Sequence, residues 1–344
     1  MARKAVVLFN LGGPDQLASV EPFLFNLFND PAIIQLPKPI RFLVAKLISK
    51  RRGPVAREIY KNLGGKSPLL EQTDAQAGAL ATVLSGLSDE YKIFVCMRYW
   101  HPRASETVLE VKNFDPDEVI LLPLYPQFST TTTASSVTEW KKVAKNADLD
   151  VKTTALCCYP NEKGFSAAYA DLILKALANV EGVVPKLLFS AHGLPKKIVD
   201  RGDPYPWQIE QSVNGILQEL GRPDLDHQIC YQSRVGPVEW IGPSTEDEIR
   251  LAGSAGQPIM VIPVAFVSEH SETLVELDLE YAEIAQESGV PGYYRVPTVT
   301  LHPKFIEGLG NLVKNRHDGG IKSACGAKIC PSSAKGCAQF STTV

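Results

Sequence analysis

Residues 258–281, PIMVIPVAFVSEHSETLVELDLEY, contain the change from strand to helix that decides the fold. An apolar, β-branched run over 260–267 predicts a buried strand that ends at Ser268. Apolar residues then recur at helical spacing and predict a helix with one core-facing stripe. That stripe consists of Leu274, Leu277, Tyr281 and Ile284. A strand followed directly by a helix is the repeating unit of an α/β sheet.

The predicted helix also carries a column of acidic residues. Glu272, Glu276 and Glu280 are spaced by four and fall on one side of a helix, where like charges repel by a few tenths of a kcal/mol per pair. An acidic first turn and a solvated face would explain Glu276 and Glu280 alone. They do not explain His270 and Glu272 together at the C-terminal end of a strand, where open α/β sheets bind ligands. We therefore expect a functional site here.

The composition excludes several classes of protein. A chain of 344 residues is long enough for two domains, and 44% hydrophobic residues with a net charge of −3 are ordinary for a globular protein without a nucleic-acid partner. No apolar run is long enough to span a bilayer. The N-terminal residues 1–4 lead straight into a predicted strand, so we expect no signal peptide and a cytoplasmic protein. Seven cysteines in such a chain favour free thiols or metal ligands over disulfides.

Strand-like apolar runs alternate with helical patterns along the chain. The expected strands are 5–10, 91–99, 119–124 and 150–157 in the first half, and 186–190, 227–232, 259–266 and 293–297 in the second. This alternation predicts an α/β fold of two similar doubly wound (Rossmann- or flavodoxin-like) halves, each with a mostly parallel sheet of about four strands. We expect the halves to be 1–160 and 161–317, with an active cleft between them and a separate tail, 318–344.

Residues 20–60 form an unusual segment that we call the lip. Bulky apolar residues are concentrated there, with lysine and arginine interleaved from Lys38 to Arg52. Such a pattern is typical of a membrane-surface contact or of the mouth of an apolar ligand pocket. An ordinary helical pair packed on the sheet explains it equally well.

Polar residues at several strand ends are expected to face one cleft. Asn10 and Arg98-Tyr99 end predicted strands, and His192 follows one, as His270 and Glu272 do. An imidazole beside carboxylates can bind a first-row divalent metal or move protons. The hydroxyl-rich loop 125–136 precedes a helix and suits a carboxylate or phosphate group, although helix capping also accounts for it. The chain has no G-x-G-x-x-G, Walker A, H-E-x-x-H or G-x-S-x-G motif.

The tail contains three of the seven cysteines, spaced as Cys325-x4-Cys330-x6-Cys337. Four thiolates complete a 2Fe–2S cluster or a structural zinc site. The adjacent pair Cys157-Cys158, at the end of a predicted strand, offers a fourth ligand. A reduced, flexible tail is the alternative.

With these motifs in view, the chain closely resembles ferrochelatases over nearly its whole length. The matching segments are NLGGP (10–14), GGKSP (64–68), MRYWHP (97–102), YPQFSTTTTASS (125–136), SAHGLP (190–195), DRGDPYP (200–206), QSRVGPVEWIGP (232–243) and VAFVSEHSETLVELDLEY (264–281). The resemblance implies a porphyrin cleft between two halves. It also implies insertion of ferrous iron into protoporphyrin IX, or a closely related porphyrin, in haem synthesis.

The resemblance also implies roles for individual residues. His192 and Glu272 would be the catalytic pair and the site of the Fe²⁺ substrate, with His270 and Glu276 in an acidic track beside it. The porphyrin-binding residues would be Asn10, Leu11, Ser67, Met97, Arg98, Tyr99, Ser129 and Trp240. The segment 20–50 resembles the lip that contacts the macrocycle and the membrane surface. We therefore expect a cytoplasmic protein peripherally associated with the inner membrane.

The tail is similar to that of the cluster-bearing branch of the family. This implies a 2Fe–2S cluster held by Cys158, Cys325, Cys330 and Cys337, with Cys157 an alternative to Cys158. Zinc, or no metal, remains open for the tail. So do the choice of protoporphyrin or coproporphyrin, the assignment of base and ligand within His192 and Glu272, and a monomer or a homodimer.

Two other functions fit part of the pattern. A chelatase that acts on an early sirohydrochlorin-type ring would use similar ligands, but such strongly acidic substrates do not suit the apolar lip. A tetrapyrrole or metal carrier would use His192, His270 and Glu272 only for coordination. Multiple turnovers of ferrous iron and porphyrin would separate an enzyme from a carrier.

Overall fold

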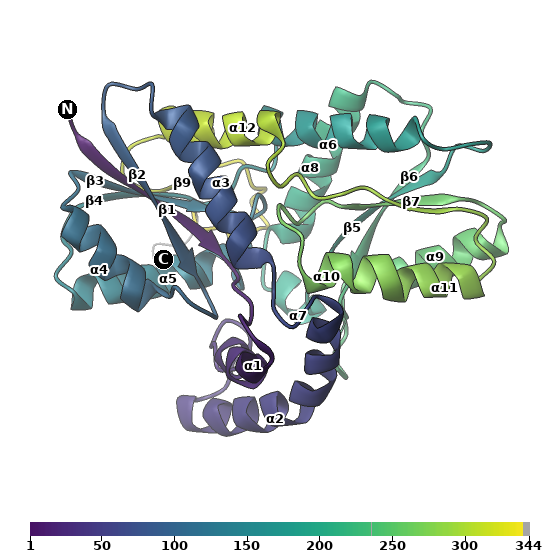
Figure 1. The fold of residues 1–344 in the computed structure, drawn as a ribbon, viewed down its shortest axis with the longest axis horizontal. Coiled ribbons are helices and arrows are strands. Elements are labelled where there is room, and N and C mark those ends of the chain that lie inside the picture. The colour runs from purple at the N-terminus through teal and green to yellow at the C-terminus, as the bar shows by residue number, and fades with distance from the viewer. Residues whose placement is uncertain (235, 340–344) are drawn as a thin grey trace.

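The chain folds into two parallel sheets, each covered by helices on both faces (Figure 1). The computed structural model describes residues 1–234 and 236–339. The first sheet has the order β2-β1-β3-β4-β9 and the second the order β6-β5-β7-β8, and all neighbours run parallel. The strands are β1 (Arg3–Asn10), β2 (Glu90–Met97), β3 (Glu118–Pro123), β4 (Lys152–Leu156), β5 (Lys186–His192), β6 (His227–Gln232), β7 (Ile259–Pro263), β8 (Tyr293–Arg295) and β9 (Gly320–Lys322).

The two sheets repeat one topology. In each half the first strand lies between the second and the third, and the fourth follows the third, which is the flavodoxin-like order. The prediction of two similar doubly wound halves is therefore confirmed. In such sheets ligands bind beyond the carboxyl ends of the strands, where the strand order reverses. Here these points are the ends of β1 and β3 in the first half, and of β5 and β7 in the second.

The central strand β1 shows why these sequences form buried parallel sheets. Residues 5–9 are all apolar and almost fully buried, as expected when both faces of a sheet are covered. Val6 and Leu8 face one core, whereas Val7 and Phe9 face another on the opposite side. The first core contains residues from both halves, so the two sheets share one apolar interior.

The helices occupy the faces of the two sheets (Figure 1). The longer ones are α3 (Leu69–Leu84), α4 (Ala104–Phe114), α5 (Thr133–Asn146), α6 (Lys163–Leu177), α8 (Tyr205–Leu220), α9 (Thr245–Ser254) and α12 (Pro303–Lys314), and the short α7 spans Lys196–Val199. In the first half, α3 and α12 cover one face and α4 and α5 the other. In the second half, α6 and α8 face the shared core, and α9 packs on the opposite face.

The end of the chain returns to the first half. Helix α12 packs on both α3 and α6, and β9 adds a fifth strand beside β4, with Gly320 paired to Thr154. The expected four strands thus become five, because part of the tail joins the sheet. The division at residue 160 stays a prediction. The last residues of the predicted tail, 340–344, lie outside the described residues.

The stretch that decides the fold differs from the expectation in two respects: its strand ends earlier than expected, and its helix is not regular. Strand β7 ends at Pro263, and the following helix has three parts: α10 (Ser271–Leu274), the π-helix η2 (Glu276–Glu280) and α11 (Tyr281–Glu287). The prediction of one regular helix is therefore wrong, because the π-helix adds one residue to a turn. Leu277 and Tyr281 of the predicted stripe are buried in the core of the second half.

The lip is a pair of helices set apart from both sheets (Figure 1). After the short 3₁₀ turn η1 (Leu17–Ser19), it consists of α1 (Val20–Phe28) and α2 (Lys38–Asn62). The helices pack on each other, and the rings of Phe25 and Phe42 meet edge to face at 5.2 Å. Helix α2 contains Pro54 in its interior and bends along its length (Figure 1). No helix in the described part of the chain is long and apolar enough to cross a membrane.

Candidate active site

The structure brings His192 and Glu272 into direct contact. His192 is the last residue of β5, and Glu272 lies in the first turn of α10, just beyond the neighbouring β7. Atom Nδ1 of His192 is 2.8 Å from Oε2 of Glu272. The side chains are 39% and 27% exposed. The pair therefore lies open to solvent at the carboxyl end of the second sheet, at its topological switch point.

His270 stands on the other side of Glu272. Its Nδ1 is 3.1 Å from the backbone oxygen of Ser268, and its Nε2 is 3.8 Å from the same Oε2 of Glu272. His270 also begins α10, because its backbone N–H donates to Oγ1 of Thr273 at 2.9 Å. The carboxylate of Glu272 thus lies between two imidazoles, one buried and one open.

This arrangement shifts the pKa of both partners. Burial lowers the pKa of His192 while the charge and hydrogen bond of Glu272 raise it, and the net shift is upward. Burial raises the pKa of Glu272, but the charges and hydrogen bonds of His192 and His270 together lower it by more. The net shift of the Glu272 pKa is strongly downward. Without a metal, the pair favours an imidazolium beside a carboxylate.

Glu276 lies next to this pair but is held by the protein. Its carboxylate accepts bonds from the backbone N–H of Ser233 at 2.7 Å, from Nε2 of Gln232 at 3.0 Å and from the hydroxyl of Tyr281 at 3.0 Å. Burial, and then the charge of Glu272, raise its pKa. Gln232 also donates to the backbone oxygen of Glu272 at 2.9 Å, so one amide links both acidic residues.

Most of the predicted porphyrin residues of the first half are buried or hydrogen-bonded to other protein residues. Asn10, at the end of β1, donates to Oγ1 of Thr73 at 3.0 Å and accepts from the backbone N–H of Leu11 at 2.8 Å. Met97 is fully buried. Ser129 is buried and donates to Asp203 at 2.9 Å. Their contact with a porphyrin stays a prediction.

Arg98 is the most strongly bonded of these residues. Its guanidinium donates to the hydroxyl of Ser135 at 2.7 Å, to Glu139 at 2.7 Å and to Asp30 at 2.8 Å. The hydroxyl of the buried Tyr99 also donates to Asp30, at 2.8 Å. Each guanidinium nitrogen of Arg98 therefore has a protein acceptor.

The remaining predicted residues are Leu11 and Ser67 in the first half and Trp240 in the second. Leu11 packs against the buried residues of the lip, and Ser67 accepts from the backbone N–H of Leu69 at 3.3 Å. Trp240 packs close to Gly193, and its buried indole N–H has no hydrogen-bond partner among the described residues. Val235, in the same motif as Trp240, lies outside the described residues.

Four buried cysteines lie near one another where the tail packs on the end of β4. Cys157 and Cys158 directly follow β4, with sulfur atoms 3.3 Å apart. Cys330 hydrogen-bonds with Cys337 and accepts from Nε2 of Gln208 at 3.2 Å. The hydrogen bond with Cys157, burial, and the nearby Cys330 and Cys337 raise the pKa of Cys158 well above its ordinary value. All four thiols are buried and near one another.

Cys325 does not join this group. It is exposed and lies near Oγ of Ser323 and the backbone oxygen of Ala327. Over residues 1–234 and 236–339, no three or more His, Cys, Asp or Glu side chains are arranged to hold a metal ion. The predicted ligand set of Cys158, Cys325, Cys330 and Cys337 is therefore only partly assembled in this structure.

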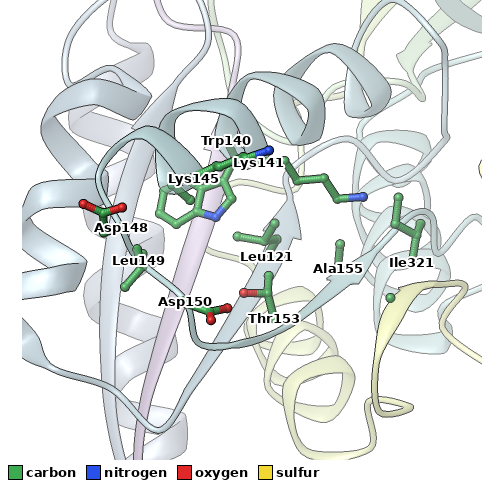
Figure 2. A pocket seen from close by; sticks show the side chains of 12 residues that line it. Leu121, Trp140, Lys141, Lys145, Asp148, Leu149, Asp150, Thr153, Ala155 and Ile321 are labelled. Atoms are coloured by element: carbon green, nitrogen blue, oxygen red, sulfur yellow. The ribbon is translucent and has the colours of Figure 1, made fainter. Parts of the chain in front are cut away.

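A cavity of about 410 Å³ lies away from the His–Glu pair (Figure 2). It is bounded by α5, β4 and β9, with Trp140 and Leu121 on its apolar wall and Lys141, Lys145 and Asp148 at its rim. None of the predicted site residues lines it.

Sequence reasoning did not assign roles to Gln232, Ser233 or Asp30. The first two lie in a motif that resembles the family, but only the fold shows that they hold Glu276. Asp30 precedes a proline after an apolar helix, which is typical of a helix end and gives no indication of a buried ion pair.

Comparisons with known proteins point to one family. The family model for ferrochelatase matches residues 3–317. The ferrochelatase of Pelagibacter ubique is 50% identical over 339 residues, covering 97% of this chain and 98% of that protein. The ferrochelatase of Rickettsia bellii is 49% identical, covering 99% and 96%. That of a Wolbachia from Drosophila simulans is 53% identical over 317 residues, covering 91% and 99%.

Solved structures share the fold at low sequence identity. SirB from Bacillus subtilis with Fe³⁺ superimposes with a TM-score of 0.52 at 11% identity, covering 93% of this chain and all of SirB. A second SirB structure, a sirohydrochlorin chelatase in complex with cobalt, gives a TM-score of 0.51 at 8% identity, with the same coverage. The family model and the curated relatives show that the chain belongs to the ferrochelatase family, whose reaction is the insertion of ferrous iron into a porphyrin in haem synthesis.

Proposed function

We propose that His192 and Glu272 form the centre at which this ferrochelatase-family chain exchanges the pyrrole protons of a porphyrin for ferrous iron. The observation that carries the proposal is their 2.8 Å contact at the switch point of the second sheet. Both side chains are partly exposed, so a substrate can reach them. At the matching strand ends of the first sheet, the polar side chains of Asn10 and Arg98 are already hydrogen-bonded to other protein residues.

Iron insertion sets a defined chemical demand. A free-base porphyrin loses two N–H protons, and the ferrous ion loses water ligands as it gains pyrrole nitrogens. Imidazole and carboxylate are suitable proton acceptors and suitable ligands for a first-row divalent metal. We propose that His192 and Glu272 share these tasks. His270 and Glu276, on either side of Glu272, extend the polar track away from the pair.

The substrate class follows from the chemistry around the pair. A porphyrin is a flat apolar disc with acidic edges, so it needs an apolar slot and polar donors at its rim. We propose that Leu11, Ser67 and Trp240 line this slot beside the lip. The other predicted porphyrin residues would fix the strand ends that shape the slot. These residues are Asn10, Met97, Arg98, Tyr99 and Ser129. A slot that fits a bent ring better than a flat one would promote metal entry by differential binding.

The test is replacement of His192 by alanine. Protein is mixed anaerobically with ferrous iron and protoporphyrin IX or coproporphyrin, and haem bands are followed in the visible spectrum. We expect His192→Ala to lose turnover with an unchanged circular dichroism spectrum. His227→Ala is the matched control, because His227 is exposed at the opposite end of the same sheet. Retained turnover in His192→Ala would remove it from the mechanism.

We also propose peripheral contact of the lip with the inner membrane. Ile40, Leu43 and Leu47 are among its large apolar side chains that are about half exposed or more. Lys46 and Lys50, also exposed, lie on the same helix. Apolar residues with a basic rim suit a surface of anionic lipids. A homodimer stays a separate prediction.

For the tail we propose a 2Fe–2S cluster that uses Cys158, Cys330 and Cys337. The support is the burial of these thiols near one another, and thiolates are the usual ligands of such clusters. The fourth ligand is Cys325, if the exposed segment around it moves inward, or Cys157. The absorption of anaerobically purified protein between roughly 400 and 600 nm is the test. Loss of this absorption in Cys157→Ala but not in Cys325→Ala would select Cys157, and a colourless wild type would refute the cluster.

A further inference from the structure

Asp30 is a buried carboxylate that the function described above does not use. It lies two residues beyond α1, and only 2% of its side chain is exposed. One oxygen, Oδ2, accepts from Arg98 and from the hydroxyl of Tyr99, both at 2.8 Å, and from the hydroxyl of Ser135. The other oxygen accepts from the backbone N–H of Ala32 at 2.8 Å. A carboxylate with four donors is fixed in position.

The donors come from parts of the first half that are distant in sequence. Arg98 and Tyr99 directly follow β2, and Ser135 is in the first turn of α5. Arg98 also bonds to Glu139, one turn further along α5, and Glu139 in turn bonds to Arg103 at 3.0 Å. The network therefore ties the end of α1 to the sheet and to α5 at once.

On the other side, Asp30 begins the turn that carries the exposed part of the lip. Its backbone oxygen accepts from the N–H of Ile33 at 3.1 Å and of Ile34 at 2.9 Å. The same turn leads into α2, which is held to it by Arg41, whose guanidinium donates to the backbone oxygens of Asn29 and Leu36. Movement of Asp30 would therefore move the turn and the start of α2.

We infer that Asp30, through Arg98 and Ser135, is the residue that positions the lip over the porphyrin slot. Asp30 touches neither substrate nor reacting atoms; it is a positioning residue that sets the aperture of the slot. The inference rests on the proposed slot beside the lip. Loss of the Asp30 charge leaves His192 and Glu272 in place and loosens one wall of the slot. The effect is therefore expected in the KM for porphyrin rather than in kcat.

A second buried ion pair, which involves a strand of the first sheet, supplies a matched control. Glu118 and Arg316 have side chains 7% and 9% exposed, compared with 2% and 12% for Asp30 and Arg98. Glu118 begins β3, at the end of the sheet opposite to the strand ends that form the site. Its removal should destabilise the fold without reaching the lip.

The experiment compares Asp30→Asn with Glu118→Gln in the full-length protein. Initial rates are measured anaerobically at saturating ferrous iron with varied protoporphyrin IX, together with the Tm of each variant. We expect Asp30→Asn to raise the KM for porphyrin about tenfold, with kcat changed less than about threefold. Glu118→Gln should lower the Tm and leave the KM unchanged. Ser135→Ala, which removes one donor to Asp30 and the acceptor of Nε of Arg98 but leaves both charges, should raise the KM about two- to threefold and is expected to fold.

Each alternative result has a defined meaning. An unchanged KM in Asp30→Asn overturns the inference; if that variant does not fold, an unchanged KM in Ser135→Ala overturns it. An equal rise of the KM in Glu118→Gln also overturns it, because the effect would then be one of general destabilisation. If His192→Ala abolishes turnover while Asp30→Asn leaves the KM unchanged, the positioning role fails and the proposed centre stands. If His192→Ala retains turnover, the proposed centre itself fails.

Discussion

The two halves of the molecule share one topology but use their equivalent strand ends differently. Asn10 ends β1 in the first half and His192 ends β5 in the second, and each strand lies between the second and third of its sheet. Asn10 is buried, and its amide bonds to Thr73 and to the backbone of Leu11. His192 is partly exposed and contacts the carboxylate of Glu272.

The difference extends to the neighbouring strands. Beyond β2, the guanidinium of Arg98 donates hydrogen bonds to Asp30, Ser135 and Glu139, all from the same half. Beyond β7, an oxygen of Glu272 contacts two imidazoles, the partly exposed His192 and the buried His270. The same fold thus provides a rigid wall in one half and titratable groups in the other. Function in such folds depends on the groups placed at the strand ends, more than on the fold itself.

The largest effect is expected from Glu272→Gln, which removes the carboxylate from the open edge. The amide keeps the size of the side chain but neither accepts a proton nor binds iron well. We expect kcat to fall by about 10²- to 10⁴-fold, the usual range for loss of a general acid or base. The measurement is the rate of haem formation under anaerobic conditions, with circular dichroism to show that the fold is retained.

The control for this change lies on the same helical segment. Glu287→Gln alters an exposed residue at the end of α11 and should change the rate less than about twofold. If both variants behave alike, the open edge of the second half has no special role. The contrast between the halves would then be structural only.

Much of this contrast could be predicted from the sequence. Buried parallel strands have apolar runs and each is followed by a helical pattern, so the halves and their strand ends were visible in the periodicity. His192, His270 and Glu272 stood out because they directly follow such strands. What the sequence pattern did not show is which polar residue has partners. The guanidinium of Arg98 is paired with Asp30 and Glu139, which are 68 and 41 residues away from it in the sequence.

The missed features have local physical causes. The π-helix η2 has no distinctive composition, so a regular helix was the natural expectation for 271–287. The tail is rich in small and polar residues, and its short strand β9 is stabilised by β4 rather than by its own propensity. Both features depend on tertiary contacts, which periodicity in one segment does not report.

An intermediate effect is expected within the second half, where a closed ion network lies beside the open pair. Glu269 accepts from Arg295 at 2.7 Å and from the backbone N–H of Thr298 at 2.8 Å, and Arg295 also bonds to Asp278. Burial, the largest single cause, raises the pKa of Glu269, but the charge of Arg295 and the hydrogen bonds to the carboxylate together lower it more, so the net shift is downward. Glu269→Gln should reduce the free energy of unfolding at pH 7 by about 3 kcal/mol, because it leaves a buried charge less well paired.

The pH dependence of this loss has a definite sign. A carboxyl group whose pKa is lowered in the folded state stabilises the protein above its unfolded pKa, about 4.3. That contribution disappears as the pH falls through the folded value. Urea unfolding of wild type and Glu269→Gln should therefore differ at pH 7 and converge below about pH 4. Glu246→Gln, from an exposed pair with Arg250, should cost less than about 0.5 kcal/mol at either pH. A difference that persists in acid would contradict the ionic origin.

The smallest effect concerns the outer surface of the first half, where the lip exposes apolar residues. Leu43 and Leu47 are 66% and 68% exposed, one turn apart on α2, whereas Leu251 on α9 of the second half is a single residue with 61% exposure. If the lip contacts lipid, Leu43→Ser/Leu47→Ser should weaken binding to anionic vesicles about tenfold, since partial burial of two leucines contributes a few kcal/mol at most. Leu251→Ser should bind like wild type. Equal binding by all three proteins would remove the membrane role from the lip and leave its apolar residues to the porphyrin slot alone.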